Sequence, residues 1–381
     1  MKGTRVTVDP KNVIELTDAA LAADYTRVRR AANLIARGLS TAGEDAAAKT
    51  LRSVVRKRGV PLRASGYIES VPVDAKSRLP LLEEQPWPEA PLLLDEEAGR
   101  AFHDFVRAAQ HIDELSAKGL ASRLGLLLSG PPGTGKTLMA AHVAAQLSRP
   151  FYAVRLDAVI SSLLGDTAKN VRTVFDFVPS QNAVLLLDEM DAVAKLRDDR
   201  HELGELKRVV NTVIQGLDSL DQHAVVIAAT NHPHLLDPAI WRRFPYKIEL
   251  GYPDVGVRED LWRHFLFEDH NEHNLSELFA TISAGLSGAD IEAIGLTARR
   301  HALLDSRPVN IASVALAAVE SQASKVALPQ SGELNTAQKK ALAQELRGRN
   351  EISGANISRL IGVTRQAVYS YLRQDEEAEH G

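Results

Sequence analysis

The chain has 381 residues, of which 45% are hydrophobic, and a formal net charge of −4. Two or three globular domains are expected at this size, and the balanced charge argues against a protein coated with nucleic acid, although it can hide a local basic patch. The absence of cysteine excludes disulfide scaffolds, thiolate zinc sites and cysteine nucleophiles. No apolar run approaches the ~18 residues of a membrane span and the amino terminus lacks a signal-peptide core, so we expect a cytoplasmic protein without a membrane partner.

The first part of the chain divides into a helical and a proline-rich stretch. Residues from Thr17 to about Arg58 are rich in Ala, Leu and Arg with helical spacing broken near Gly43, which predicts a small all-α amino-terminal hairpin within residues 1–60. Its arginines are interpreted as a solvated helix face, with contact to a partner or to nucleic acid as the alternative. Residues 61–90 contain frequent prolines and no lasting period, which is the composition of a stiff linker.

Short apolar runs then alternate with helical stretches over residues 91–253. This rhythm predicts an α/β fold in which helices cover both faces of a parallel sheet, giving three layers. The expected strands are Leu124–Leu128, Phe151–Val154, Ala183–Leu187, Ala224–Ala229 and Lys247–Leu250.

The pattern becomes wholly helical afterwards. Residues 254–329 predict a small helical lid with breaks at 270–274, 284–288 and 306–310, and residues 335–374 predict a separate module of three short helices, followed by an acidic end.

A glycine-rich segment after the first expected strand fits the phosphate-loop pattern at every fixed position and precedes an expected helix, 138–147. Glycines let backbone N–H groups turn toward phosphate oxygens, and the helix presents its positive end to the same anion. We expect Lys136 to reach the β- and γ-phosphates of ATP, and the Thr137 hydroxyl to bind Mg²⁺. The loop residues are Gly130, Pro131, Pro132, Gly133, Thr134, Gly135, Lys136 and Thr137, with Leu138 following as a further nucleotide contact.

Two adjacent acids follow the hydrocarbon strand 183–187. A carboxylate leaving such a strand is badly solvated unless a cation is near, so Asp188 is interpreted as a second Mg²⁺ partner. Glu189 would then polarise the attacking water. We interpret Asp191 as an ordinary acid at a helix start, favoured there by the helix dipole.

Together, GPPGTGKT, VLLLDEMD, AATNHPHLLDPAIWRRF and GLSGADI resemble the AAA ATPases, close to the katanin, spastin and FtsH-like branch, over roughly residues 91–327. The resemblance implies a P-loop NTPase core and a homo-oligomeric ring, usually a hexamer, that acts on a protein substrate. It also implies that Asn231 is the first sensor, that Arg242 and Arg243 are arginine fingers, and that Gly288 and Ala289 lie at the nucleotide-facing end of the lid. An arginine finger stabilises the charge that develops on the transferred phosphoryl group.

One segment departs from the family pattern. Relatives carry an aromatic residue in a loop that grips threaded polypeptide, whereas this chain has Leu163, Leu164 and Gly165 there. The loop keeps an apolar tip but loses the stacking surface of a ring.

The carboxyl-terminal run 355–372 resembles a helix-turn-helix, with Gly362 supplying the turn. Seven basic and two acidic residues over 335–373 give it a local net charge of +5. A DNA-binding role and a protein-docking role both fit the pattern. In the DNA role, the contacts would come from Thr364, Arg365, Gln366, Tyr369 and Arg373.

The leading hypothesis is therefore a ring ATPase that uses ATP and Mg²⁺ to remodel or unfold a protein, recruited to DNA by its carboxyl-terminal module. The alternative is a DNA-bound ATP switch that assembles on DNA and recruits another protein. A binding module with a dead nucleotide site conflicts with the apparently complete catalytic set.

Overall fold

The computed structural model describes residues 10–21, 31–32, 34–36, 38–39, 47–51, 71–74, 77–155, 167–191, 203–270, 272–321, 325–350 and 352–376. Within the amino-terminal region these include helix α1 (Pro10–Leu21) and short helical pieces. The expected hairpin turn near Gly43 lies outside the described residues. Among those described, we find no helix with the length and hydropathy needed to cross a bilayer.

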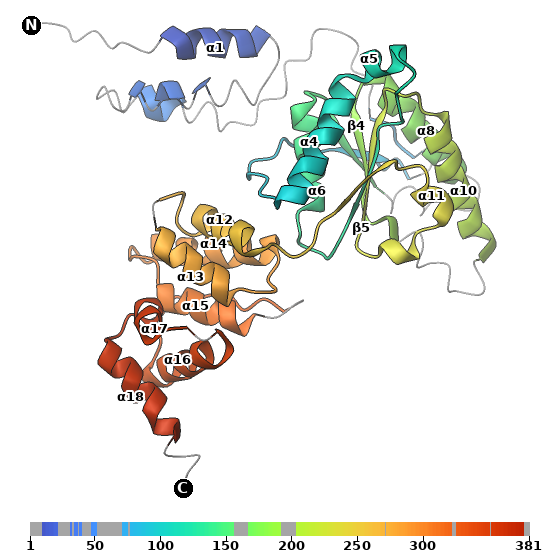
Figure 1. The fold of residues 1–381 in the computed structure, drawn as a ribbon. Coiled ribbons are helices and arrows are strands. Elements are labelled where there is room, and N and C mark those ends of the chain that lie inside the picture. Colours follow the sequence, from blue (N-terminus) through green and yellow to red (C-terminus); the bar gives the residue numbers. More distant parts are fainter. Residues whose placement is uncertain are drawn as a thin grey trace, which may run out of the picture.

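A six-stranded sheet forms the centre of the α/β subdomain (Figure 1). Its strand order is β1-β3-β4-β5-β2-β6, and every neighbouring pair is parallel except β1 with β3. The strands are β1 (Leu82–Glu84), β2 (Gly125–Ser129), β3 (Phe151–Val154), β4 (Val184–Leu187), β5 (Val225–Thr230) and β6 (Tyr246–Glu249). The five parallel strands lie within one residue of their predicted positions, because each is a short, continuous apolar run.

The edge strand β1 was not predicted. Its residues fall within the stretch 61–90 that the prolines identified as a linker, yet Leu81 and Leu82 are fully buried and β1 pairs antiparallel with β3. A three-residue strand is too short for a period-2 pattern to be recognised, and prolines are tolerated beside an edge strand. Part of the expected linker therefore belongs to the sheet.

Helices cover both faces of the sheet, as expected for three layers. On one face α4 (Glu96–Gln110) and α6 (Lys136–Gln146) share a core with inward residues of β2, β4 and β5. On the other face α8 (Thr167–Ser180) and α10 (Leu203–Ser219) contribute to a second core. Figure 1 shows the two helix layers on either side of the strands. The short helices α5 (Ile112–Ala117) and α11 (Pro238–Trp241) complete the subdomain.

Four helices form the lid at the predicted positions. They are α12 (Val255–Phe265), α13 (His273–Ile282), α14 (Gly288–Leu304) and α15 (Ile311–Glu320). The breaks coincide with helix caps: the Ser287 and Asp290 side chains form a capping box at the start of α14, and the Asn310 side chain accepts from the Ser313 amide at the start of α15.

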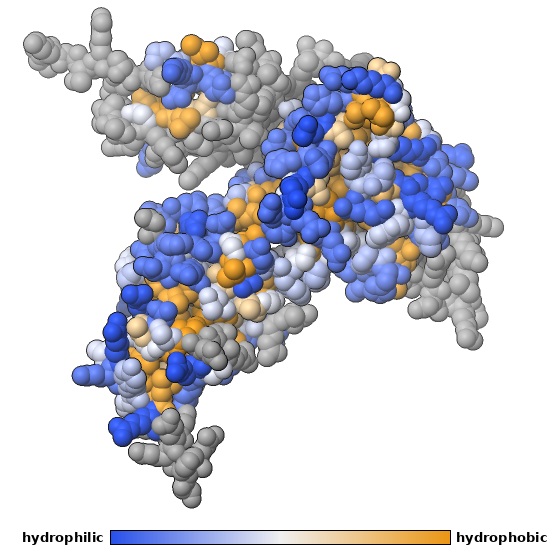
Figure 2. All heavy atoms as spheres, in the orientation of Figure 1, coloured by the Kyte–Doolittle hydropathy of each residue, from blue (hydrophilic) through white to orange (hydrophobic). Residues whose placement is uncertain are grey.

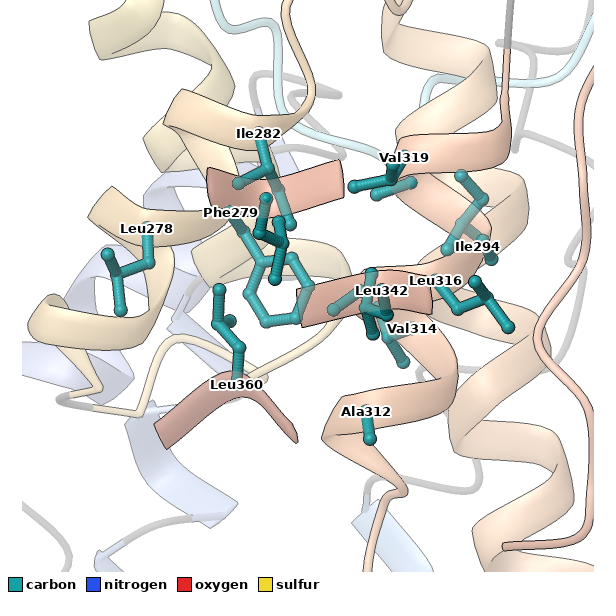
Figure 3. Packing of buried hydrophobic residues seen from close by; sticks show 14 of the residues in the cluster. Leu278, Phe279, Ile282, Ile294, Ala312, Val314, Leu316, Val319, Leu342 and Leu360 are labelled. Atoms are coloured by element: carbon teal, nitrogen blue, oxygen red, sulfur yellow. The ribbon is translucent and has the colours of Figure 1, made fainter. Parts of the chain in front are cut away.

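The carboxyl-terminal helices α16 (Thr336–Asn350), α17 (Gly354–Ile361) and α18 (Arg365–Glu376) pack on the lid through a single hydrophobic core. Figure 3 shows Phe279 of α13, Val314 of α15, Leu342 of α16 and Leu360 of α17 directed into this shared interior. On the face seen in Figure 2, apolar residues gather over the lid and these helices, whereas the α4 side of the α/β subdomain is mainly hydrophilic. The lid and the carboxyl-terminal helices are therefore joined by packing as well as by the connector.

The shared core leads to a testable prediction. We expect Leu360→Ala, which removes a fully buried side chain from α17, to lower the free energy of unfolding by about 2–5 kcal/mol. Hydrogen exchange should show protection falling in α13–α15 together with α16–α18, while β2, β4 and β5 keep theirs. The matched control is Leu304→Ala, whose side chain is 74% exposed and should change stability by less than about 0.5 kcal/mol. Loss of protection confined to α16–α18 would contradict a shared core.

Candidate nucleotide site

The glycine-rich loop joins the end of β2 to the start of α6. Gly130 and Gly133 have φ angles of +140° and +77°, in a region that residues with a Cβ rarely adopt. A Cβ at Gly130 would lie 2.0 Å from the Leu250 carbonyl oxygen, so a side chain there would displace the backbone beyond β6. The predicted loop thus has the required conformation, and α6 begins at Lys136 rather than at the expected residue 138.

Lys136 lies inside this loop. Its Nζ donates hydrogen bonds to the carbonyl oxygens of Gly130 and Pro131, at 2.9 and 2.8 Å. Burial lowers the pKa of Lys136 from its usual value, and the negative charges of Asp188 and Asp191 oppose that shift. The two carboxylates therefore help to keep a buried ammonium charged where a phosphate would be held.

The side chains predicted to hold Mg²⁺ meet at the carboxyl ends of β2 and β4. Thr137 Oγ1 donates to Asp188 Oδ2 over 2.9 Å, and Asp188 Oδ1 accepts from the Glu189 amide over 2.8 Å. A hydroxyl and a carboxylate are the hard oxygen ligands that Mg²⁺ prefers, and this ion is usually held by one or two such groups together with phosphates. The donor set therefore fits Mg²⁺.

Glu189 and Asn231 line the same cavity as the loop. Glu189 is exposed and has a left-handed backbone, with φ +51°, directly after the Asp188 carboxylate. This conformation is uncommon for a residue with a side chain, and such residues concentrate at functional sites.

The structure adds a role for Asp191, which lies at a helix start. Its side chain is 4% exposed, and its Oδ1 accepts from the Thr230 hydroxyl at 3.1 Å and the Asn231 amide at 3.2 Å. It therefore fixes the backbone of the expected sensor residue to the segment after β4. No local sequence pattern indicates this role, because the three residues approach only when β4 and β5 pair.

A cavity of about 380 Å³ lies over these groups, between the loop and the lid. The lid contributes polar and small groups at the start of α14, where the Ala289 amide donates to the Gly133 carbonyl at 3.1 Å. Gly288 and Ala289 thus line the cavity as predicted from the resemblance. Apolar residues that the sequence did not single out form the remaining wall: Pro91, Leu92, Leu93, Leu94, Val257, Leu261 and Phe265. Apolar cavity walls have the same sequence pattern as a core, so no signal distinguishes them.

Arg242 and Arg243 lie outside this cavity, after α11, and differ from each other. Arg243 is held within its own chain: its Nη2 is 2.7 Å from Asp218 Oδ2, and its Nη1 donates to the Ala239 carbonyl. The same Asp218 side chain also pairs with Arg123 at 3.0 Å. The Arg242 side chain is exposed, and within the described part of the chain it makes no hydrogen bond or ion pair. Neither arginine therefore lines the nucleotide cavity of its own chain. Of the two, Arg242 is the one whose side chain is available for a contact with another molecule.

The predicted loop residues Leu163, Leu164 and Gly165 lie outside the described residues. The carboxyl-terminal residues can be placed. Gly362 ends α17 with φ +69°, and Thr364 Oγ1 accepts from the Ala367 amide at the start of α18. The side chains predicted to contact DNA are all exposed on or just before α18: Thr364, Arg365, Gln366, Tyr369 and Arg373.

Together the loop, the Thr137–Asp188 pair and the parallel sheet define a P-loop NTPase. A profile of the ATPase family associated with various cellular activities (AAA) matches residues 126–252. Residues 126–252 therefore match an ATPase domain of the AAA family. The crystal structure of the FIGL-1 AAA domain has the same fold, with a TM-score of 0.53 and 24% identity, over 70% of this chain and 91% of that one.

Curated relatives agree with this assignment. An uncharacterized AAA family ATPase, y4kL, of Sinorhizobium fredii is 43% identical over 158 residues, which cover 42% of this chain and 48% of that protein. ATPase family gene 2 protein homolog B of Homo sapiens is 35% identical over 235 residues, 60% of this chain and 31% of its own length. The ATP-dependent zinc metalloprotease FtsH 3 of Sphaerobacter thermophilus is 37% identical over 174 residues, 44% of this chain and 36% of its own. The chain thus spans less than half the length of these relatives.

The hydrogen bonds of Asp191 lead to a prediction. We expect Asp191→Ala to lower the free energy of unfolding by about 1–3 kcal/mol, because one buried and one partly buried donor lose their acceptor. ATP turnover should fall by up to about a hundredfold with a smaller change in ATP affinity, since Asn231 is displaced while the loop is intact. Denaturant unfolding and steady-state kinetics measure the two effects. Asp176→Ala, an exposed acid on α8, is the control, and wild-type behaviour of Asp191→Ala would refute the role.

Proposed function

We propose that the chain hydrolyses ATP with Mg²⁺ at this cavity. The observation that carries the proposal is the Thr137–Asp188 hydrogen bond, which places an alcohol and a carboxylate next to the Lys136 loop. Lys136 would bind the β- and γ-phosphates, and Thr137 with Asp188 would hold Mg²⁺, which would neutralise phosphate charge when bound. Glu189 would polarise the attacking water and Asn231 would orient it.

Hydrolysis would require assembly. Charge developing on the transferred phosphoryl group needs a cation, and an arginine finger contributes about 10³ to 10⁵ in rate. The chain's own Arg242 and Arg243 lie outside its nucleotide cavity, which supports supply from a neighbouring copy in a ring, typically a hexamer. Because Arg243 is tied to Asp218, we assign direct phosphate contact to Arg242 and a supporting role to Arg243.

We further propose that the ring remodels or unfolds a protein partner. The resemblance to the katanin, spastin and FtsH-like branch supports this. So does a continuous set of contacts from the phosphate loop through the lid to the carboxyl-terminal helices. The Ala289 amide contacts the phosphate loop through Gly133, and the same lid shares one core with α16–α18. A change at the nucleotide would therefore move the carboxyl-terminal helices with the lid as one body.

Complementation between variants tests the shared site. Arg242→Ala removes the finger but leaves a complete pocket, whereas Glu189→Gln disables the pocket but leaves the finger. We expect each variant alone to lose about 10³ or more of the ATPase rate. A mixture should recover activity, because some sites combine the Arg242→Ala pocket with the Glu189→Gln neighbour's arginine.

The control mixture combines Lys136→Ala with Glu189→Gln. Both changes disable the pocket, so no shared site is complete and no recovery is expected. If size-exclusion chromatography shows that Arg242→Ala and Glu189→Gln co-assemble but their mixture has no added activity, the proposal that a neighbouring copy supplies the arginine is wrong.

The Glu189→Gln variant also tests for a protein partner. Since this variant should hold ATP without turnover, a protein partner should remain bound to it in ATP and leave in ADP.

A second candidate function is DNA recruitment. Three observations favour it: the net charge of +5 over residues 335–373, the Gly362 turn, and the exposed side chains along α18. Arginine and glutamine side chains on such a helix suit phosphate and base-edge contacts in a major groove. DNA binding would either bring the remodelling ring to a DNA-bound protein or, in the alternative function, make the chain an ATP switch that assembles on DNA and recruits another protein.

Salt dependence tests the DNA contacts. We expect the affinity for duplex DNA to fall steeply with salt, and the Arg365→Gln/Arg373→Gln double variant to bind more weakly with a logarithmic salt slope smaller by about 2. Fluorescence anisotropy over a salt series measures both. Arg172→Gln, an exposed arginine on α8, is the matched control. An affinity for DNA that does not change with salt, or that is the same in the double variant, would contradict the proposal. Either result would favour protein docking by these helices.

A further inference from the structure

A second cavity, of about 510 Å³, lies where the lid meets the carboxyl-terminal helices. Its walls come from the end of α14, the loop before α15, the connector at residues 329–334, and α16 and α17. This volume lies in the range of small-molecule sites. None of the functions proposed above uses it.

Basic side chains from three separate elements line this cavity: Arg307 before α15, Lys339 on α16 and Arg359 on α17. None of the three has an ion-pair partner in the part of the chain that the structure describes; Arg359 has only a long hydrogen bond, 3.5 Å, to Asn356. Two acids, Asp305 and Glu333, also line the cavity. The lining therefore has a formal net charge of +1, with histidine counted as neutral. Its three cations form no ion pair within the described part of the chain.

His301 adds a polar side chain to this lining. It lines the cavity, and its Nδ1 is the one buried side-chain nitrogen or oxygen without a hydrogen-bond partner among the described residues. Because Nδ1 is inaccessible, it is least costly as a bare lone pair, which puts the ring hydrogen on Nε2. His301 can then offer the cavity a hydrogen-bond donor from Nε2.

The connector that closes one side of the cavity is fixed in place. Ser313 Oγ donates to the Gln330 carbonyl at 3.0 Å and accepts from the Gln330 amide at 2.7 Å. Asn310 Nδ2 donates to the Gly332 carbonyl at 3.0 Å. Leu334, Leu360 and Ile361 provide an apolar wall. The cavity therefore has a set shape, and its lining combines cations with hydrocarbon.

We propose that this cavity binds a small organic anion, with one or two carboxylate or phosphoryl charges and a short apolar portion. Arg307, Lys339 and Arg359 would pair with the anionic group and His301 would donate to it. Asp305 and Glu333 would disfavour more highly charged ligands. The site is separate from the nucleotide cavity, yet α14 lines both: Gly288 and Ala289 at its start, and His301 near its end. A ligand here would contact the same helix that rests on the phosphate loop.

Binding can be measured on the full chain without reference to ATP turnover. Imidazole NMR of ¹⁵N-histidine-labelled protein, saturated with ADP and held at constant pH, reports on His301, whose signals are assigned from their absence in His301→Gln. The two probes are succinate, for the carboxylate class, and inorganic phosphate, for the phosphoryl class. Calorimetry on the same samples gives a second reading. We expect a saturable response to at least one probe, with a dissociation constant below about 10 mM.

The variants assign the response to this cavity. Lys339→Gln and Arg359→Gln should each weaken binding about threefold to tenfold, because each removes one charge-assisted contact. Arg300→Gln, an exposed residue beside His301 that does not line the cavity, should bind as wild type. A response that rises linearly without saturation, no response to either probe, or equal weakening by Arg300→Gln would overturn the proposal. Inactivity of the ATPase would not affect the measurement, so the two proposals fail separately.

Discussion

The hydrogen bond between Thr137 and Asp188 depends on the whole arrangement of the sheet. It joins residues 51 positions apart, one after β2 and one after β4, and both strands pair with β5 between them. Parallel strands bring their carboxyl ends to one edge, so Asn231 after β5 arrives between the other two segments. Asp191 then connects the segment after β4 to the end of β5 through its hydrogen bonds with Thr230 and Asn231. The chemistry proposed for the cavity follows from this strand order.

The cavity also requires the lid. The sheet edge alone would leave the phosphate loop open to water, and the apolar wall from α12 and the amide of Ala289 come from the other subdomain. A nucleotide held between two subdomains can alter the angle between them, which is how hinge closure responds to ligands. Since the arginines after α11 do not line their own cavity, the complete site in the proposed ring would join three bodies: two subdomains and a neighbouring copy.

Local sequence patterns predicted most of the fold. The five parallel strands and the lid helices were recognised because apolar runs, caps and breaks are encoded within a few residues. The phosphate loop and the Asp188–Glu189 pair were also recognised from a few consecutive residues. What could not be predicted depends on contacts between distant segments: β1 is too short for a pattern, and Asp191 becomes an anchor only beside Thr230. The apolar wall, including Leu93 and Leu261, has the sequence pattern of an ordinary core. The roles expected of Arg242 and Gly288 came from the family resemblance rather than from the residues themselves.

The joint interior of the lid and the carboxyl-terminal helices bears on how such a chain can change in evolution. A domain attached through an exposed linker can be exchanged by recombination, because few contacts cross the boundary. Here a crossover in the connector would separate Leu342 and Leu360 from Phe279 and Val314, and leave a hydrocarbon surface on each product. We therefore expect inheritance of the two helical groups as one block instead of replacement of the carboxyl-terminal helices alone.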